Sequence, residues 1–391
     1  MGESRAQQLP SLAINGIYTH VGKVTSFTIP MGNISRTFRF GTSDRFNAEL
    51  SLRLPLFTWG RISGGIGMAH TGKELSVLER RREISAILYQ TIQAYYSVLL
   101  NQRIIELHRS NVRRSEEFLK IAENRYKSGA IPRLEILRTE VQLKNSISQL
   151  EDANGNLQKS ALLLRKLIQY PDTAIHLEGA LRFNPVNAVE ENIMDRALEV
   201  RSDLNAIELQ QVLKEYEIQI AGSSNKPSLM FFSGYNVQNG FDPTNPDRFV
   251  DNWNLGLQLS FPLFNGFATT HKIENARLDY QKAVLQKQEL QDIILLQIRQ
   301  ALTTLHQSAL KIGSQQENIK LADEAVGVAT EQFSLGIASS LDVLTAQQTL
   351  SQSEMLYSQA LFNHIMAKLE LSRIMEEYSW FAPELEKSLE K

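Results

Sequence analysis

The sequence contains no cysteine among its 391 residues. Disulfide bonds, thiolate metal sites and a cysteine-linked lipid anchor within this stretch are therefore excluded. The apolar runs are short and interrupted by Gln, Ser or Lys, so no transmembrane helix is predicted. The net charge is only −2, which gives no electrostatic basis for binding nucleic acid. Taken alone, this composition favours a soluble, cytoplasmic protein.

Proline is also scarce, and its absence from two long stretches predicts long helices. Neither 71–127 nor 270–335 contains a proline. In the first stretch, apolar residues recur at helical spacing, as in Ile84, Leu88 and Ile92. A helix of about 60 residues is about 90 Å long. The pattern therefore indicates a helical rod.

The two stretches belong to an internal repeat with an offset of 207 residues (336 − 129). "RYKSGAIPRLEIL" at 125–137 matches "QFSLGIASSLDVL" at 332–344, and "LRLPLF" at 52–57 matches "LSFPLF" at 259–264. The interval from proline to glycine is 74 residues in both copies (129 − 55 and 336 − 262). Because loops tolerate insertions and packed helices do not, this constancy indicates a rod whose length matters.

Each copy is predicted to contain a helical hairpin. Gly129 and Gly336 lie where a helix end requires positive φ, and Pro132 suits the first turn of the returning helix. The first predicted repeat, 1–180, has strands at about 9–21 and 46–54 and a helical hairpin at about 63–169. The second, 181–391, has a helix at about 189–221, strands at about 227–237 and 253–261, a helical hairpin at about 270–376 and a polar tail.

The strands at 46–54 and 253–261 alternate apolar and hydrophilic residues over nine positions, which is the length of a tilted strand that crosses a bilayer. The strands at 9–21 and 227–237 are their upstream partners. The residues predicted to face lipid are Leu50, Leu52, Leu54, Trp253, Leu255, Leu257 and Leu259. A soluble sandwich is the alternative, but the chain offers no second apolar layer. Four strands cannot close a barrel. Two chains would give eight strands with a filled interior, whereas three would give twelve strands and a pore.

In the order of these motifs, the chain resembles the TolC-type outer-membrane efflux proteins over nearly its whole length. The motifs are the "LPLF" and "FPLF" joints, "AYYSVLL" at 94–100, the two turn motifs, and "ALEVRSDLNAIELQQVLKEYEIQIAGSSNKPSL" at 197–229. The resemblance implies a mixed α and β membrane protein, a homotrimer with a twelve-stranded barrel in outer-membrane lipid and a helical tunnel through the periplasm. It also implies a periplasmic adaptor, an inner-membrane pump of RND, ABC or MFS type, no enzymatic activity and no cofactor.

One departure concerns the start of the chain. The second copy has a predicted helix ahead of its first strand, whereas the first copy has only Met1–Leu9 there, without the apolar segment of a secretory signal. By the internal symmetry we expect a further helix and a signal peptide upstream. We therefore interpret the chain as a fragment or as the product of a misassigned start.

The resemblance assigns roles to the two hairpin turns. Adaptor-docking residues are expected at Lys127, Ser128, Gly129, Leu134, Ser334, Leu335, Gly336, Ile337 and Leu341. In the family, "LDVL" followed by a second acid lines the constriction of the closed tunnel. Here Asp342 supplies the first acid, Thr345 occupies the position of the second, and Glu135 is the counterpart of Asp342 in the first repeat. The alternative is that both acids are ordinary charges at the start of a helix.

Two weaker signals do not support an enzyme. "GMAHTGKE" at 67–74 is close to a phosphate-binding loop, but Glu74 stands where Ser or Thr should hold magnesium, so the glycines are expected to ease the step from strand to helix. The histidines show no pair at metal-ligand spacing. They are His20, His70, His108, His176, His271, His306 and His364.

The resulting hypothesis is an outer-membrane exit duct of a tripartite efflux or type I secretion system, with no metal, cofactor or nucleic acid. The alternative is a soluble coiled-coil scaffold without a transport role. The amphipathic strands favour the duct, because a scaffold has no use for a lipid-facing side.

Overall fold

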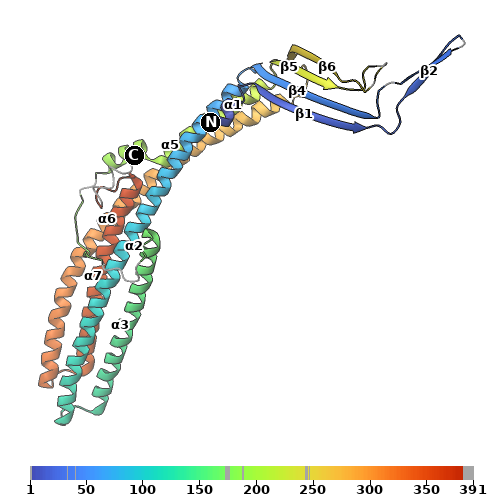
Figure 1. The fold of residues 1–391 in the computed structure, drawn as a ribbon. Helices are drawn as coiled ribbons and strands as arrows, with labels where there is room; N and C mark the ends of the chain where they lie inside the picture. The colour runs from blue at the N-terminus through green and yellow to red at the C-terminus, as the bar shows by residue number, and fades with distance from the viewer. Residues whose placement is uncertain are drawn as a thin grey trace. The chain divides into compact units, whose positions relative to one another are not determined.

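The computed structural model describes residues 2–32, 34–39, 41–171, 177–186, 189–242, 245 and 247–381 (Figure 1). The helices are α1 (Gly2–Ala6), α2 (Arg61–Lys127), α3 (Arg133–Ile168), α4 (Glu190–Val200), α5 (Ser202–Ser223), α6 (Ala268–Leu335) and α7 (Ser340–Ile374). The strands are β1 (Ser11–His20), β2 (Ser26–Met31), β3 (Ile34–Arg39), β4 (Asp44–Phe57), β5 (Ser228–Gln238) and β6 (Val250–Ser260). Among the described helices, none combines the length and apolarity needed to cross a membrane.

The chain divides into two compact units. A sheet unit comprises the described parts of 1–77 and 206–287, and a helical unit those of 78–205 and 288–391. Each unit takes residues from both predicted repeats, because equivalent elements of the two copies pack together. The predicted repeats 1–180 and 181–391 describe the internal similarity of the sequence and do not coincide with the two compact units, so this division remains a prediction.

The sheet has the order β1-β4-β5-β6, and all of its neighbouring strands are antiparallel. Strands were predicted at 9–21, 46–54, 227–237 and 253–261, and the structure has strands at each of these places. β4 is longer than expected, with 14 residues, and has a register shift between Pro55 and Phe57. The separate hairpin of β2 and β3 was not predicted, because "SFTIPM" contains Pro30, which argues against a strand, and "ISRTFR" shows no clear alternation.

Two sharp turns lead from the sheet to the long helices. Trp59 and Gly60 both have positive φ, of 49° and 87°, before α2. Gly266 and Phe267, at the equivalent positions of the second copy, both have φ of 63° before α6. One residue of each pair is glycine, which adopts this conformation without a steric cost. The other is aromatic, so each turn also positions a large ring.

The helical unit is built from four main helices, α3, α7 and the adjoining parts of α2 and α6, together with the short helix α4. The helix α3 contributes the buried Thr139 and Ser146 to the core of this unit, and fully buried apolar side chains come from α2, α6 and α7. The largest are Val98, Phe118, Ile294, Ile298, Phe333, Val343, Leu369, Leu371, Ile374 and Tyr378. Tyr378 lies beyond the end of α7, and its hydroxyl donates to the carbonyl oxygen of Ser85 in α2 at 3.0 Å. The predicted hairpins, at about 63–169 and 270–376, are thus joined into one bundle.

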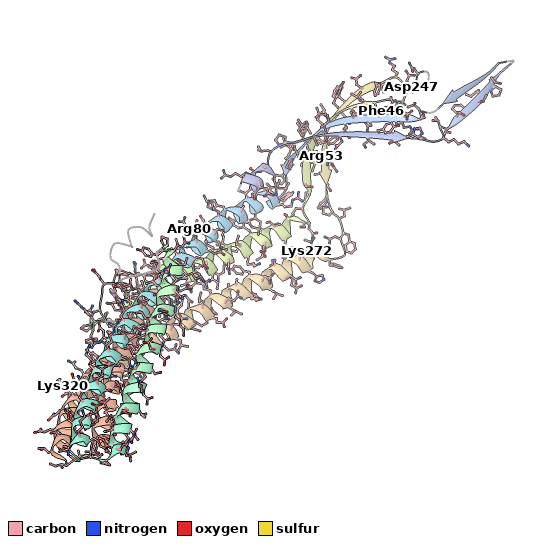
Figure 2. The ribbon with its side chains drawn as sticks, turned by 60° about the horizontal axis from the view of Figure 1, so that its bottom comes forward. Phe46, Arg53, Arg80, Asp247, Lys272 and Lys320 are labelled. Atoms are coloured by element: carbon pink, nitrogen blue, oxygen red, sulfur yellow. The ribbon has the colours of Figure 1, made fainter. Side chains whose placement is uncertain are left out.

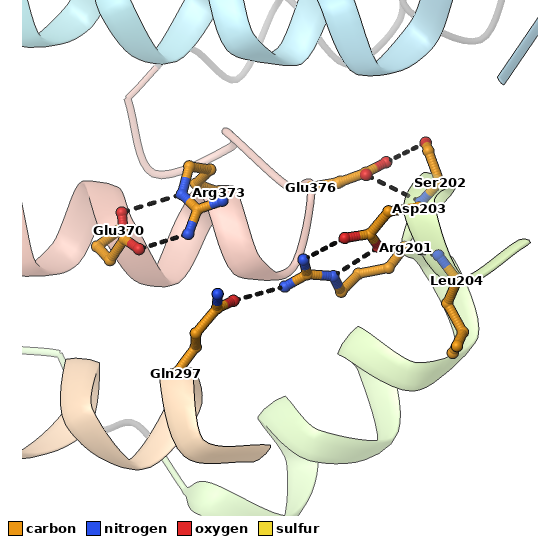
Figure 3. A network of polar contacts seen from close by, with 8 residues as sticks. All are labelled: Arg201, Ser202, Asp203, Leu204, Gln297, Glu370, Arg373 and Glu376. Atoms are coloured by element: carbon orange, nitrogen blue, oxygen red, sulfur yellow. Dashed lines mark hydrogen bonds and ion pairs between the residues drawn. The ribbon is translucent and has the colours of Figure 1, made fainter. Parts of the chain in front are cut away.

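The prediction of a single helix at about 189–221 is wrong at Arg201. This residue is extended, with φ −60° and ψ 122°, and separates α4 from α5. The reason is a polar network that sequence periodicity does not reveal (Figure 3). The Arg201 guanidinium donates to both carboxylate oxygens of Asp203, at 2.9 and 2.5 Å. The Glu376 carboxylate accepts from the backbone N–H and the hydroxyl of Ser202, at 2.9 and 2.5 Å, and so caps the new helix.

Candidate functional site

Both hairpin turns lie at the same end of the helical unit (Figure 1). They are held together by a small buried cluster of Phe118 and Ala122 from α2, Phe333 from α6 and Val343 from α7. The two phenylalanine rings are 5.1 Å apart between centroids. The guanidinium of Arg125 also lies 5.1 Å from the centre of the Phe333 ring. The turns therefore form one packed surface.

The two turns share the same backbone geometry. Gly129 and Gly336 have φ of 75° and 85°, as predicted. In the first turn, the N–H of Ala130 donates to the carbonyl of Arg125 and that of Gly129 to Tyr126, both at 2.8 Å. The equivalent pairs in the second turn are bonded at 2.9 and 3.1 Å. This is the Schellman arrangement that ends a helix at glycine.

All of the predicted adaptor-docking residues are exposed in the single chain. Four of them are large and apolar, with exposed fractions of 54% for Leu134, 68% for Leu335, 74% for Ile337 and 56% for Leu341. Exposure of apolar side chains to water is unfavourable, so a cluster of four of them at one end of the helical unit indicates a surface that contacts another molecule. The backbone conformation of the turns requires only the two glycines. It gives no reason for large apolar side chains at the neighbouring positions.

Asp342 forms the start of α7. Its carboxylate accepts from the backbone N–H and the hydroxyl of Ser339, at 2.8 and 2.7 Å, which is a capping box. The side-chain bond from Ser339, followed by the backbone bond, holds the pKa of Asp342 below its ordinary value of 3.8. Thr345, one turn further on, is exposed like Asp342, and its hydroxyl donates to the carbonyl of Leu341 at 2.7 Å.

The contacts of Glu135 differ from those of Asp342, although Glu135 is the counterpart of Asp342 in the first repeat. Its carboxylate accepts from the backbone N–H of Ser340 at 3.1 Å and from the Ser340 hydroxyl. It also forms an ion pair with Arg138 at 3.1 Å. Glu135 thus caps α7 from the neighbouring hairpin. Sequence reasoning missed this contact, because Ser340 is 205 residues away.

In the sheet unit, directly paired residues lie on the same face, so the register defines an apolar surface. One transverse row is Ile14, Leu50, Tyr235 and Trp253, and the next is Leu12, Leu52, Ser233 and Leu255. Further rows contain Leu54, Phe231 and Leu257, and then Leu229 and Leu259. The seven residues predicted to face lipid all belong to this face. Those on β6 are 62% to 70% exposed, while Leu52 and Leu54 are half-buried.

Aromatic residues border this apolar face at both ends. At the end away from the helices the rings are Tyr18, Phe46, Tyr235, Phe249 and Trp253; at the other end they are Phe57, Trp59, Phe261, Phe264 and Phe267. Such girdles mark the two interfaces of a membrane-spanning barrel. The face thus has the aromatic borders that are typical of a lipid-contacting surface.

The loop-like motif at 67–74 is part of the continuous helix α2 and forms no phosphate cradle. A Cβ on Gly67 would lie 2.4 Å from the ring of Tyr216. On Gly64, it would lie 3.0 Å from Ile220. These glycines allow α5 to approach α2 closely, which is a more specific reason than an eased step from strand to helix. Among the described residues, no three His, Cys, Asp or Glu side chains gather around a common point, and His176 lies outside them.

Comparison with known proteins agrees with this architecture. The family model for outer membrane efflux proteins matches residues 1–168 and 193–375. Nodulation protein T of Rhizobium leguminosarum bv. trifolii is 20% identical over 354 residues, covering 90% of this chain and 74% of that protein. Alkaline protease secretion protein AprF of Pseudomonas aeruginosa is 24% identical over 340 residues, covering 83% and 68%. The solved outer membrane protein VceC of Vibrio cholerae shares the fold, with a TM-score of 0.78 at 17% identity over 96% of this chain and 89% of that one.

Proposed function

The chain belongs to the outer membrane efflux protein family, and on this basis we propose that three copies form the exit duct of a tripartite efflux or type I secretion system. The apolar face that runs across all four strands of the sheet carries this proposal. It faces outer-membrane lipid, while the opposite, polar face lines the pore. A soluble scaffold gives no reason for such a face.

Closure of the barrel follows from the two edges of the sheet. β1 and β6 each have one side without a strand partner among the described residues. Unpaired backbone groups are not tolerated in lipid, so these edges must pair with other copies. With four antiparallel strands per chain, β1 of one copy meets β6 of the next in antiparallel orientation. Three copies give twelve strands and leave room for a pore.

The exposed apolar surface at the hairpin turns is proposed to dock a periplasmic adaptor, which in turn joins an inner-membrane pump of RND, ABC or MFS type. Leu335, Ile337 and Leu341 from the second hairpin and Leu134 from the first supply the apolar contact. Polar side chains such as Lys127 and Ser334 surround it.

The neighbouring Asp342, repeated by threefold symmetry, is proposed to form a ring of carboxylates at the tunnel constriction. Thr345 leaves that ring without a second acid.

The lipid-facing assignment is tested by comparing two neighbouring residues of β6. Leu257→Arg places a cation against lipid and should cost about 2–4 kcal/mol at the mid-membrane, so membrane assembly should fail. Gln258→Arg, on the polar face, should assemble like the wild type. The measurement is the yield of detergent-extracted trimer from outer membranes. Equal defects in the two variants would contradict the proposal.

Adaptor docking is tested by site-specific photo-crosslinking in cells that express the complete export system. A crosslinker at Ile337 should capture the adaptor. A crosslinker at Gln316, exposed on α6 about 30 Å from the turn, is the matched control and should not. Continued transport without any capture at Ile337 or Ser334 would show that docking occurs elsewhere.

The constriction is tested by single-channel recording. Asp342→Asn is nearly isosteric and should leave trimer yield unchanged. The ring of three carboxylates attracts cations, so its loss should weaken cation selectivity and block by multivalent cations. Unchanged selectivity and block would leave Asp342 with its capping role alone.

A further inference from the structure

The polar face of the sheet carries charge on one strand only. On this face, β4 presents Arg45, Glu49 and Arg53, each four residues from the next. The corresponding positions of β1, β5 and β6 are all uncharged. They are Ser11, Ala13, Asn15, Ile17 and Thr19 on β1, Ser228, Met230, Phe232, Gly234, Asn236 and Gln238 on β5, and Val250, Asn252, Asn254, Gly256, Gln258 and Ser260 on β6.

The register places each charge in a row of neutral neighbours. Glu49 pairs with Asn15 and Asn236, and Asn236 pairs with Asn252. Arg53, labelled in Figure 2, pairs with Ser11 and Phe232. Within the described part of the chain, neither Glu49 nor Arg53 forms an ion pair. These charges are therefore not neutralised within the sheet, and they can interact with ions on the side of the polar face.

The row that contains Arg53 has a further distinguishing feature. Phe232 pairs with Gly256, and a Cβ on that glycine would lie 2.7 Å from the Phe232 ring. The Phe232 ring thus lies over Gly256 of the neighbouring strand and stays partly exposed on the polar face. Arg53 and Phe232 together offer a cation beside an apolar surface, the combination that suits an organic anion.

We propose that the barrel carries a ladder of charged rings, positive at Arg45, negative at Glu49 and positive at Arg53, that favours passage of anions through the outer-membrane section. This inference rests on the proposed trimeric barrel, in which each side chain occurs three times around the pore. Four residues of strand span about 13 Å, or about 10 Å along the axis of a barrel whose strands are tilted by about 40°. The three rings sum to a positive charge.

The spacing determines how the rings act. At about 0.1 M salt the Debye length is about 10 Å, close to the spacing of the rings, so an ion beside one ring interacts mainly with that ring. At about 1 M salt the Debye length is about 3 Å, and the rings are largely screened from the middle of the pore. Asp44 and Asp251 lie on the opposite, apolar face of the sheet, so they do not neutralise the ladder. The Arg53 ring, nearest the helices, is the first that cargo from the tunnel meets.

The experiment is the reversal potential of single channels in planar lipid bilayers under a KCl gradient. The parent protein carries Asp342→Asn, so that the carboxylate ring of the constriction does not dominate the selectivity. Arg53→Gln should shift the preference toward cations, and Glu49→Gln should shift it toward anions. Arg53→Lys keeps the charge and should behave like the parent. Ser51→Gln, a neutral change on the same face between the two charges, is the matched control and should leave the reversal potential unchanged.

Two further readouts separate charge from shape. Both shifts should be larger at about 0.1 M than at about 1 M KCl, because screening removes an electrostatic effect and leaves a steric one. Tripolyphosphate added on the barrel side should block the parent more strongly than Arg53→Gln. Unchanged reversal potentials, or shifts of the same sign for Arg53→Gln and Glu49→Gln, would overturn the ladder while leaving the duct intact. If the parent forms no channels, the proposed function itself fails and the ladder with it.

Discussion

The two hairpin turns have equivalent sequences and the same backbone, but they make different contacts. Phe333 is 1% exposed in the buried cluster, whereas Tyr126, its repeat counterpart, is 42% exposed. Ser339 forms a capping box with Asp342, whereas Pro132, at the equivalent position, has no side-chain cap. A repeat thus conserves the local conformation, while packing between the two copies gives equivalent residues different surroundings. Each of the following predictions tests that inequality.

The largest effect is expected from the aromatic pair. Phe333→Ala removes a fully buried ring and should cost about 3–5 kcal/mol. Tyr126→Ala, the equivalent change in the first turn, should cost about 0.5 kcal/mol or less, because the side chain is exposed. Thermal unfolding of the detergent-extracted protein, followed by helical circular dichroism, measures both. Similar losses of stability in the two variants would mean that the turns are equivalent after all.

Substitution of the two turn glycines should give a smaller difference in stability loss between the turns. Gly129→Val and Gly336→Val each force a β-branched residue into positive φ, at a cost of about 1–2 kcal/mol. Gly336→Val should be the more harmful, because its Cβ would lie 3.1 Å from the Nη2 atom of Arg125, while nothing lies within 4 Å of Gly129. The same unfolding measurement compares them. A larger loss for Gly129→Val would contradict this assignment of the crowded turn.

Removal of the Glu135 carboxylate should have an effect that no change in the second turn reproduces. Glu135→Ala takes away a cap from the neighbouring hairpin and should cost about 1 kcal/mol. Amide hydrogen exchange at Ser340 should accelerate, because its N–H loses its acceptor. Asp342→Ala should instead accelerate exchange at Ser339. If Glu135→Ala left exchange at Ser340 unchanged, the contact between the hairpins would not exist in solution.

The smallest effect is a pH dependence confined to the second turn. The pKa of Asp342 is lowered in the folded state by its bonds with Ser339, so its stabilising contribution is present above the unfolded pKa. It is lost as the pH falls from about 4 through the lowered value. The protection factor of the Ser339 amide, which is its intrinsic exchange rate divided by its observed rate, should therefore fall below about pH 4, and Asp342→Asn should remove this step. A step of equal size in the variant would assign the effect to another group.

The elements that depend on local chemistry could be predicted from the sequence alone. The absence of proline and the helical spacing predicted the two long helices, and the runs after the two glycines predicted the shorter returning helices. The glycines themselves predicted turns with positive φ, and strict alternation predicted two of the four strands and their apolar face. These succeed because a helix end that needs positive φ, or a strand with one apolar side, is specified by neighbours along the chain. The fold class and the family followed from the order of these elements.

Tertiary structure alone decided what those elements contact. The break at Arg201 depends on Glu376, and the environment of Glu135 depends on Ser340, both far away in the sequence. Likewise, Phe333 and Tyr126 occupy equivalent positions, and only the packing of one hairpin against the other buries the first and exposes the second. The physical reason is that burial and hydrogen bonding depend on residues brought together in space. A repeat in the sequence therefore predicts where a chain turns, but not which copy of a side chain the fold will bury.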